Sequence, residues 1–378
     1  MTTPAPLGKR IYTWNFWACA VIAGLAVLLL VKRFVFGIGS VSNMNDGYPW
    51  GIWIAYDVVV GTALACGGYA MALLVYIFNR GEYSPLVRPA LMTSLFGYTL
   101  AGLSVMIDLG RYWQAYNIFL PWYSNLHSVM FEVALCIATY VLVLWMEFAP
   151  AILEKLKADQ LRARLNRVIF VFIALGILLP TMHQSSLGTM MLMAGYKLSP
   201  LWRTGFLPLL FLLTALLMGY AIVMVESFIS QAWFKTPSEM PLLSKISQFM
   251  PWLLGFYLVI RLESINLAGN LGLAFDGSLQ GNMFLLENAL LIAAFLILIY
   301  PRNREKERML FLASSAVVLG ASLYRINTYI IGFDPGTGWQ YFPSVSELTI
   351  TLGVVATEGM AYMWVVNRLP VLPKAEHA

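Results

Sequence analysis

The sequence predicts an all-α protein that crosses a membrane about ten times. Of its 378 residues, 60% are hydrophobic and 11% are charged, whereas a soluble domain usually carries about 25% charged residues. The apolar residues fall into ten long runs, and a bilayer core needs roughly 20 apolar residues per helix. The lysines and arginines lie mainly in short connections between the runs. We therefore expect a single integral membrane domain over 1–378, with short cytoplasmic tails at 1–11 and 368–378.

The ten apolar runs give the expected spans in chain order. The first follows Lys9 and Arg10, as in a signal peptide, but it is too long for a signal-peptide core and no small-residue cleavage site follows it, so we expect a retained span. The seventh and eighth runs are interrupted by Arg261, Glu263 and Glu287 and have the weakest pattern. The spans are expected at 12–33, 50–78, 88–110, 125–148, 165–182, 203–229, 249–267, 282–300, 308–327 and 346–367.

The distribution of basic residues predicts the orientation. With the N-terminus placed in the cytoplasm, 17 of the 24 lysines and arginines lie in cytoplasmic segments and seven lie in the outer half. Positive charge favours the cytoplasmic side, so both termini are expected there. The outer connections are longer and rich in glycine, proline, asparagine and aromatic residues. They suit either a docking platform for a partner or simple links between helices.

The third run ends in an acid, an arginine and two aromatic residues. Asp108 and Arg111 are three residues apart, about one helical turn, so they are expected to share a face. Tyr112 and Trp113 are of the kind that settle at a lipid–water boundary. Charges at membrane depth are costly unless they are paired or functional. We expect one wall of a polar pocket here, with a structural ion pair as the alternative.

Further ionisable residues lie inside or beside other runs. Asp57 and Glu132 each lie about two turns inside the outer ends of their runs, and Glu358 lies near mid-bilayer in the last run. An intramembrane acid is by default a candidate for a proton path, with a structural role as the alternative. His127 and His183 lie in polar boundary segments, where a histidine is either a ligand-binding group or simply a hydrogen-bonding one.

Two arginines inside apolar runs have acidic neighbours. A buried charge needs a partner, so we expect Arg261 to pair with Glu263 and Arg325 to pair with Glu347. Both pairs are interpreted as structural ion pairs.

Several chemistries are absent from the sequence. No phosphate-binding loop, dinucleotide fingerprint, metalloprotease motif or nucleophile elbow is present, and no basic groove suits nucleic acid. Cys19, Cys66 and Cys136 lie in separate runs, and three thiolates cannot hold a four-cysteine iron–sulfur cluster. A haem-b site needs paired histidines within spans, whereas His127 and His183 lie at boundaries. Acids, an imidazole and aromatics without a metal-ligand set suit a quinone, whose reduction also requires protons.

Asp108-Leu109-Gly110-Arg111 resembles the D-L-G-R signature of the NrfD/polysulfide-reductase membrane-subunit family. Within that family, the chain is similar to the integral membrane subunits of hydrogenase-2-type nickel–iron hydrogenases, from about Val31 to Pro370. The further matching stretches are Gly47-Tyr48-Pro49-Trp50-Gly51, Ala65-Cys66-Gly67-Gly68, Phe78-Asn79-Arg80-Gly81, Pro85-Leu86-Val87-Arg88-Pro89-Ala90-Leu91, Glu147-Phe148-Ala149-Pro150 and Leu179-Pro180-Thr181-Met182-His183-Gln184-Ser185-Ser186.

The resemblance implies two four-helix bundles side by side with flanking helices, in the bacterial inner membrane. It implies that this chain holds no haem and no iron–sulfur cluster, and that its cofactor is a quinone, either menaquinone or ubiquinone. It implies as partners a periplasmic ferredoxin-like iron–sulfur subunit and the large and small [NiFe]-hydrogenase subunits, besides membrane lipid. The chain departs from many family members at Cys66-Gly67-Gly68, where they carry a histidine or another polar group.

The expected function is therefore to pass electrons from the iron–sulfur partner to a quinone near the periplasmic face. The chain itself is not expected to act on hydrogen. A secondary transporter, which would carry polar residues at broken helices in mid-membrane, a haem-b anchor of an oxidoreductase and a bare anchor are the alternatives. The expected quinone-binding residues are Asp108, Arg111, Tyr112, His127 and His183, and the expected proton relay is Asp57, Glu132 and Glu358.

Overall fold

The computed structural model describes residues 4–373, which form helices and loops without a β-strand. Within a bilayer core, a helix satisfies every backbone N–H and C=O inside one segment, which is why long apolar runs adopt it. In this part of the chain, ten helical segments are long and apolar enough to cross a membrane. The predicted all-α polytopic fold is thus confirmed. The segments are 14–36, 53–77, 81–108, 129–155, 159–193, 207–234, 240–267, 279–298, 307–331 and 345–368.

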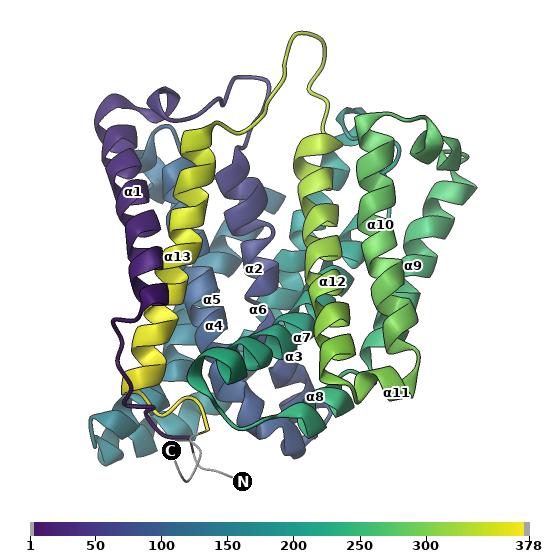
Figure 1. Cartoon of the computed structure of the whole chain (residues 1–378). Helices are drawn as coiled ribbons and strands as arrows, with labels where there is room; N and C mark the ends of the chain where they lie inside the picture. Colours follow the sequence, from purple (N-terminus) through teal and green to yellow (C-terminus); the bar gives the residue numbers. More distant parts are fainter. Residues whose placement is uncertain (1–3, 374–378) are drawn as a thin grey trace. The chain divides into compact units, whose positions relative to one another are not determined.

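Figure 1 shows the α-helices along the chain. They are α1 (Trp14–Phe36), α2 (Gly61–Leu64), α3 (Gly67–Ala72), α4 (Val87–Asp108), α5 (Val129–Lys155), α6 (Asp159–Met193), α7 (Leu207–Phe234), α8 (Met240–Ile246), α9 (Met250–Leu267), α10 (Leu279–Leu298), α11 (Pro301–Arg304), α12 (Glu307–Ile326) and α13 (Val345–Arg368). The chain divides into two compact units. Unit 1 consists of Met1–Ala65, Leu91–Gly176 and Pro335–Ala378, and unit 2 consists of Cys66–Ala90 and Ile177–Asp334.

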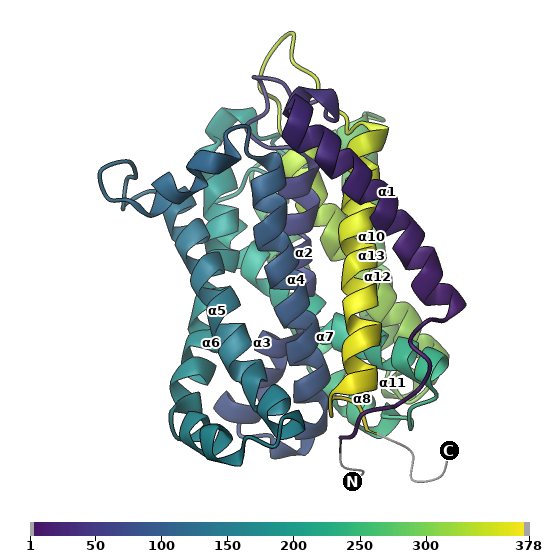
Figure 2. The ribbon, with the colours of Figure 1, turned by 90° about the vertical axis from the view of Figure 1, so that its left-hand side faces the viewer.

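In unit 1, the first and last spans pack against each other. Helix α1 lies against α13 and crosses it at an angle (Figure 2). The crossing is close because Gly353 of α13 meets Ala26 of α1, and small residues let helix backbones approach in a membrane. The segments near the two ends of the described chain also meet, since the Ala5 N–H donates to the Leu372 carbonyl oxygen at 3.2 Å. The outer face of α1 carries exposed apolar side chains, which suits contact with lipid.

In unit 2, α7 is the central helix. It packs against α3, α9 and α12, and α10 packs against α9 and α12. Gly219 of α7 lies against the backbone of Cys66, where an added Cβ would come within 2.6 Å of the Cys66 carbonyl oxygen. The core that these helices enclose is mainly apolar and includes Phe211, Leu217, Met224, Leu254 and Leu291.

The second span is not one continuous α-helix. It passes through a π-helical segment at Trp53–Val58, the short helices α2 and α3, and a second π-helical segment at Leu73–Ile77. π-Helical turns are rare and occur frequently at functional sites. Asp57 lies within the first of these segments.

Replacing Gly353 with alanine is expected to destabilise unit 1. The new Cβ would lie 2.1 Å from the Ala26 Cβ, so α1 and α13 would have to separate, and such overpacking typically costs about 1–3 kcal/mol. Thermal unfolding of the purified protein would show a lower Tm. Gly24→Ala on α1 is the matched control, because nothing lies within 4 Å of a Cβ there. Equal Tm values for the two variants would contradict the close α1–α13 crossing.

Candidate functional site

Asp108 is the buried acid at the end of α4 in unit 1. One of its carboxylate oxygens, Oδ1, accepts a hydrogen bond from the Gly51 N–H at 3.1 Å, at the start of the second span. Arg111 lies in the turn after the helix and is exposed. The expectation that Asp108 and Arg111 share a helix face is therefore wrong, because α4 ends at the acid.

The cation buried at this place is Arg33, in the last turn of α1. Its Nε donates to the Ile107 carbonyl oxygen at 2.9 Å, and its Nη2 donates to the Leu109 carbonyl oxygen. The last carbonyl groups of a helix lack partners within it and attract positive charge. The guanidinium also lies 5.2 Å from the ring centre of Tyr112, which is half-buried. Arg33 thus stabilises the end of α4.

Glu347 and Tyr341 form a second hydrogen-bonded group in unit 1. The Tyr341 hydroxyl donates to Glu347 Oε1 at 2.7 Å and accepts from the Ile52 N–H at 2.8 Å. The other carboxylate oxygen of Glu347 accepts from the N–H groups of Asn43 and Ser344 at 3.0 and 2.7 Å. Burial and the neighbouring carboxylate raise the pKa of the Tyr341 phenol, which therefore stays protonated and donates. The expected pairing of Glu347 with Arg325 did not anticipate these contacts.

Asp57 is buried between α4 and α13 of unit 1. Its Oδ2 accepts a hydrogen bond from the Ser104 hydroxyl at 2.9 Å, and the Thr351 hydroxyl lies near the same carboxylate without a hydrogen bond to it. Ser104 and Thr351 are both buried. Asp57 therefore has hydroxyl groups of two other spans as neighbours. An acid inside a membrane protein is expected to face polar groups of the protein and not lipid.

A further acid, Glu358, lies on α13 two helical turns from Thr351, opposite Gly97 of α4. Glu358 follows Thr351 by seven residues, and Gly97 precedes Ser104 by seven. The two residues of each pair therefore lie on the same face of their helix and are roughly 10 Å apart along its axis. The Glu358 Oε1 would lie 3.6 Å from a Cβ added at Gly97. Tyr56 lies within electrostatic range of both Asp57 and Glu358. We name this set, Asp57, Ser104, Thr351, Gly97 and Glu358, the unit 1 seam.

Two other expected residues of unit 1 lie nearer the surface. Glu132 is half-buried in the first turn of α5 and not two turns deep, because the helix begins at Val129. An acid in the first turn is favoured by the helix dipole. His127 is exposed in the preceding loop, where its main-chain N–H donates to Asn125 Oδ1 at 3.0 Å.

His183 lies in unit 2 and is fully buried. Its Nδ1 lies 2.9 Å from the Leu179 carbonyl oxygen, and its Nε2 lies 3.0 Å from the side-chain nitrogen of Gln184. Both ring nitrogens therefore have neighbours at hydrogen-bonding distance. The described contacts thus place His183 in unit 2, whereas Asp108, Tyr112 and Asp57 lie in unit 1.

Unit 2 also contains a fully buried ion pair that joins α9 to α10. Arg261 Nη2 lies 2.8 Å from Glu287 Oε1, and both side chains are wholly buried. Glu287 also accepts from the Trp202 indole and from Asn327 Nδ2, the latter at 2.7 Å. The expected partner Glu263 is exposed, so the predicted Arg261–Glu263 pair is wrong. Sequence spacing could not match Arg261 to Glu287, because the two residues lie on different helices.

Arg325, in the last turn of α12, is the other buried cation of unit 2. Its Nη2 donates to the Phe211 carbonyl oxygen at 2.6 Å and to the Thr214 hydroxyl at 3.2 Å, both on α7. These contacts anchor the guanidinium to α7 within unit 2, and the expected pair of Arg325 with Glu347 stays a prediction.

The fold and these buried polar groups define a multi-pass membrane protein with a polar site inside its helices. The chain belongs to the NrfD family, since the family model "Polysulphide reductase, NrfD" matches residues 40–332.

Three relatives illustrate the family. The chain is 45% identical to the "Probable Ni/Fe-hydrogenase 2 b-type cytochrome subunit" of Escherichia coli, over 98% of this chain and 95% of that one. It is 25% identical to the "Menaquinone reductase, integral membrane subunit" of Nitratidesulfovibrio vulgaris, over 89% and 86% of the two chains. It is 23% identical to a subunit of the selenate reductase of Mesobacillus selenatarsenatis, over 97% and 95%.

The name of the Escherichia coli relative includes a b-type cytochrome, which disagrees with the absence of haem that the sequence predicts. Of the three histidines, His127 is exposed, His183 has neighbours at both ring nitrogens, and His377 lies outside the described residues. Within residues 4–373, no group of three or more His, Cys, Asp or Glu side chains could hold a metal ion. The expected absence of haem therefore stays a prediction.

Replacing Glu287 with glutamine is expected to destabilise unit 2 strongly. The change leaves the Arg261 guanidinium buried without its carboxylate, and breaking a buried ion pair in this way typically costs about 3–5 kcal/mol. The measurement is unfolding of the purified protein in detergent. Glu263→Gln, on the exposed side of α9, is the matched control. If both variants unfold alike, the pair does not stabilise the unit.

Proposed function

We propose that this chain is the membrane subunit of a respiratory uptake hydrogenase complex and passes electrons to a membrane quinone. Its membership of the NrfD family supports a membrane subunit of an oxidoreductase complex. The relatives named as subunits of a Ni/Fe-hydrogenase and a menaquinone reductase support the hydrogenase and quinone assignments. We place the chain in the bacterial inner membrane with both termini in the cytoplasm, as the excess of basic residues there favours.

The proposed electron donor is a ferredoxin-like iron–sulfur subunit on the periplasmic face, itself reduced by the [NiFe]-hydrogenase subunits. The connection before α5 supports such a docking surface. Trp113, Tyr116, Trp122 and Tyr123 are all exposed along it, and aromatic side chains are enriched at protein interfaces. This connection follows Asp108 and Tyr112 directly in the sequence, so a partner docked on it would lie beside the proposed quinone site.

The proposed quinone site lies at the Asp108 end of unit 1. Bound there, the quinone would accept two electrons together with two protons. Tyr112 offers an aromatic face held by Arg33, and Asp108 offers a carboxyl group fixed by the Gly51 N–H. Arg111 and His127, both exposed, would contact the headgroup at the rim of the site. The expected hydrogen bond from His183 to the quinone stays a prediction, since this residue belongs to unit 2.

The proposed proton path runs along the carboxyl and hydroxyl groups of the unit 1 seam. In the unit 1 seam, Asp57 accepts a hydrogen bond from Ser104 of α4 and lies near Thr351 of α13, and Glu358 lies two helical turns from Thr351 on α13. Carboxyl and hydroxyl groups in such a series can exchange protons in sequence. The seam would carry protons toward the quinone, and Glu132 would admit them from the outer side. This alignment of Asp57 with Glu358 is the single observation that carries the proposal.

The test is hydrogen-dependent quinone reduction by the purified complex. Asp57→Asn and Glu358→Gln are each expected to lower the rate by about 100-fold or more, the usual contribution of a proton-transferring group. Glu154→Gln is the matched control, because that glutamate pairs with Arg162 at 3.2 Å on the partly exposed end of α5. Reduction of an artificial electron acceptor by the hydrogenase subunits should not change. If Asp57→Asn and Glu132→Gln both keep the full rate, the proton assignment is wrong.

The second test concerns the bound group. The purified chain is expected to show no haem Soret absorbance and to retain a lipophilic quinone on extraction. Chromatography of the extract against menaquinone and ubiquinone standards identifies which quinone it is. A Soret band in proportion to the protein would contradict the expected absence of haem and would favour a b-type cytochrome.

A secondary transporter is the second candidate, favoured by the interrupted second span, since transporters bind substrates at broken helices. Solute counterflow in liposomes that contain this chain alone would support the transporter and oppose the electron-transfer role.

A further inference from the structure

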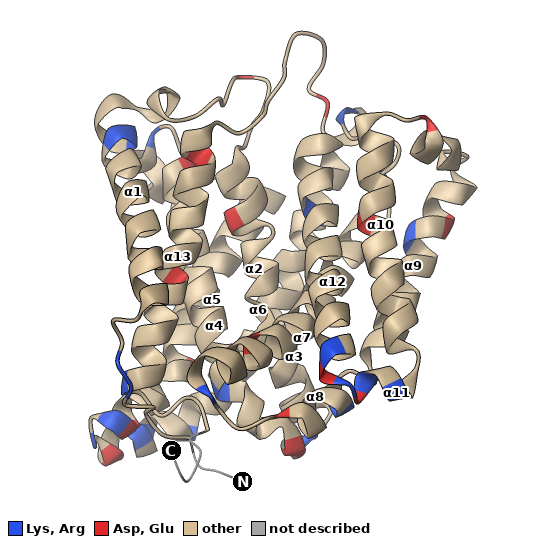
Figure 3. Cartoon of the chain, viewed as in Figure 1, with Lys and Arg blue, Asp and Glu red and all other residues tan. Residues whose placement is uncertain are grey.

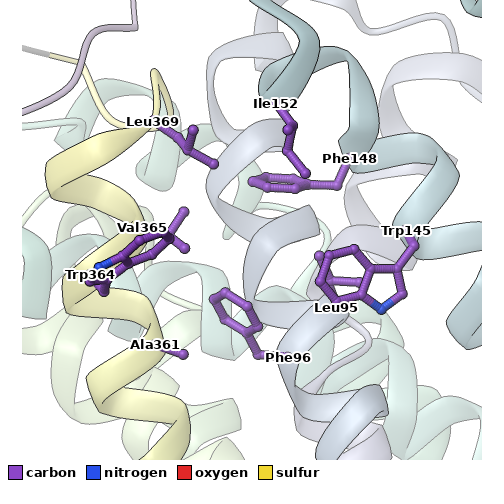
Figure 4. Close-up of a pocket in the computed structure, with 9 residues that line it drawn as sticks. All are labelled: Leu95, Phe96, Trp145, Phe148, Ile152, Ala361, Trp364, Val365 and Leu369. Atoms are coloured by element: carbon purple, nitrogen blue, oxygen red, sulfur yellow. The ribbon is translucent and has the colours of Figure 1, made fainter. Parts of the chain in front are cut away.

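An apolar groove lies on unit 1, between α4, α5 and α13. It has a volume of about 380 Å³, and all the side chains that line it are aliphatic or aromatic. Figure 4 shows Phe96 of α4, Trp145 and Phe148 of α5 and Trp364 of α13 around it. Trp145 and Trp364 are 44% and 53% exposed, so the groove opens to the surroundings of the span. It offers no carboxyl, hydroxyl or imidazole group that would hold the headgroup of a quinone.

The groove ends where two spans end. Ile152 lines it one turn before Lys155, the last residue of α5, and Leu369 lines it directly after Arg368, the last residue of α13. Both cations are exposed. Two acids lie in the same stretch of chain: Glu154 is paired with Arg162, and Asp159 is exposed at the start of α6. Figure 3 shows that lysines and arginines gather at this end of unit 1 and that a smaller number of acidic residues lies among them. The groove is therefore apolar along its length and positively charged at its mouth.

These two properties match one class of molecule. An acyl chain fills an apolar groove on the side of a membrane span, and basic residues at the mouth select an anionic headgroup. A neutral lipid would gain from the groove but not from Lys155 and Arg368. A phosphatidylglycerol-like phospholipid gains from both.

We propose that this groove binds one acyl chain of an anionic phospholipid, whose phosphate is held by Lys155 and Arg368. The site lies on unit 1 at the end opposite Asp108, because α5 and α13 end there whereas α4 ends at Asp108. It is independent of the quinone and of the direction of electron flow. An experiment that disproves the quinone function therefore leaves the lipid site possible, and one that disproves the lipid site leaves the quinone function possible.

The test is native mass spectrometry of the purified protein in detergent. The protein is titrated with phosphatidylglycerol and, separately, with phosphatidylcholine of the same acyl chains. The wild type is expected to retain one phosphatidylglycerol in preference to phosphatidylcholine. Lys155→Gln/Arg368→Gln should weaken retention of phosphatidylglycerol by roughly tenfold or more, because two cations beside the phosphate are lost. Arg302→Gln/Lys306→Gln, which removes two exposed cations of unit 2, is the matched control.

A second variant tests the groove itself. Ala361→Phe fills the space beside Phe96 and Trp364 and is expected to abolish retention of both lipids. If this variant unfolds, the charge variant at the surface still decides the matter. Equal binding of the two lipids by the wild type, or equal losses in the charge variant and its control, would overturn the proposal. Displacement of phosphatidylglycerol by added menaquinone would also overturn it, since the groove would then hold an isoprenoid tail.

Discussion

The structure depends on a constraint that lipid imposes: a polar group inside the helices has to find its partner within the protein. Among residues 4–373, the three fully buried arginines each donate to a main-chain carbonyl oxygen of another segment. Arg33 does so at the end of α4, Arg261 at Leu201 and Arg325 at Phe211. The buried acids Asp108 and Glu347 accept main-chain N–H groups in the same way. Charged side chains thus satisfy main-chain groups of other segments of the chain.

The two units use buried charge differently. In unit 2, Glu287 accepts hydrogen bonds from Arg261, Trp202 and Asn327, so it lies in a closed arrangement that suits a fixed structure. In unit 1, Asp57 faces hydroxyl groups from two other spans instead of a guanidinium. A carboxyl group in such surroundings can gain and lose a proton without leaving a cation unpaired. This difference is the physical reason for locating the proposed proton path in unit 1.

Much of the fold could be predicted from sequence, because lipid converts each long apolar run into a helix. The burial of Asp57 and Asp108 could also be predicted from their depth in those runs. Their partners could not, since contacts such as Asp108 with Gly51 or Arg33 with Ile107 join residues far apart in the chain. The errors at Arg111 and Glu132 have one cause. Hydropathy defines a run but not the residue at which its helix ends, and one turn decides whether a side chain is buried or exposed.

Helix α1 exposes apolar side chains along most of its length, yet it supplies the guanidinium that closes the end of α4. A shortened protein that began after α1 would lose the contact with α13. It would also leave the carbonyl oxygens of Ile107 and Leu109 without their donor and Tyr112 without its cation. The first span therefore supports the Asp108 end of unit 1 as well as α13, and its removal would destabilise both.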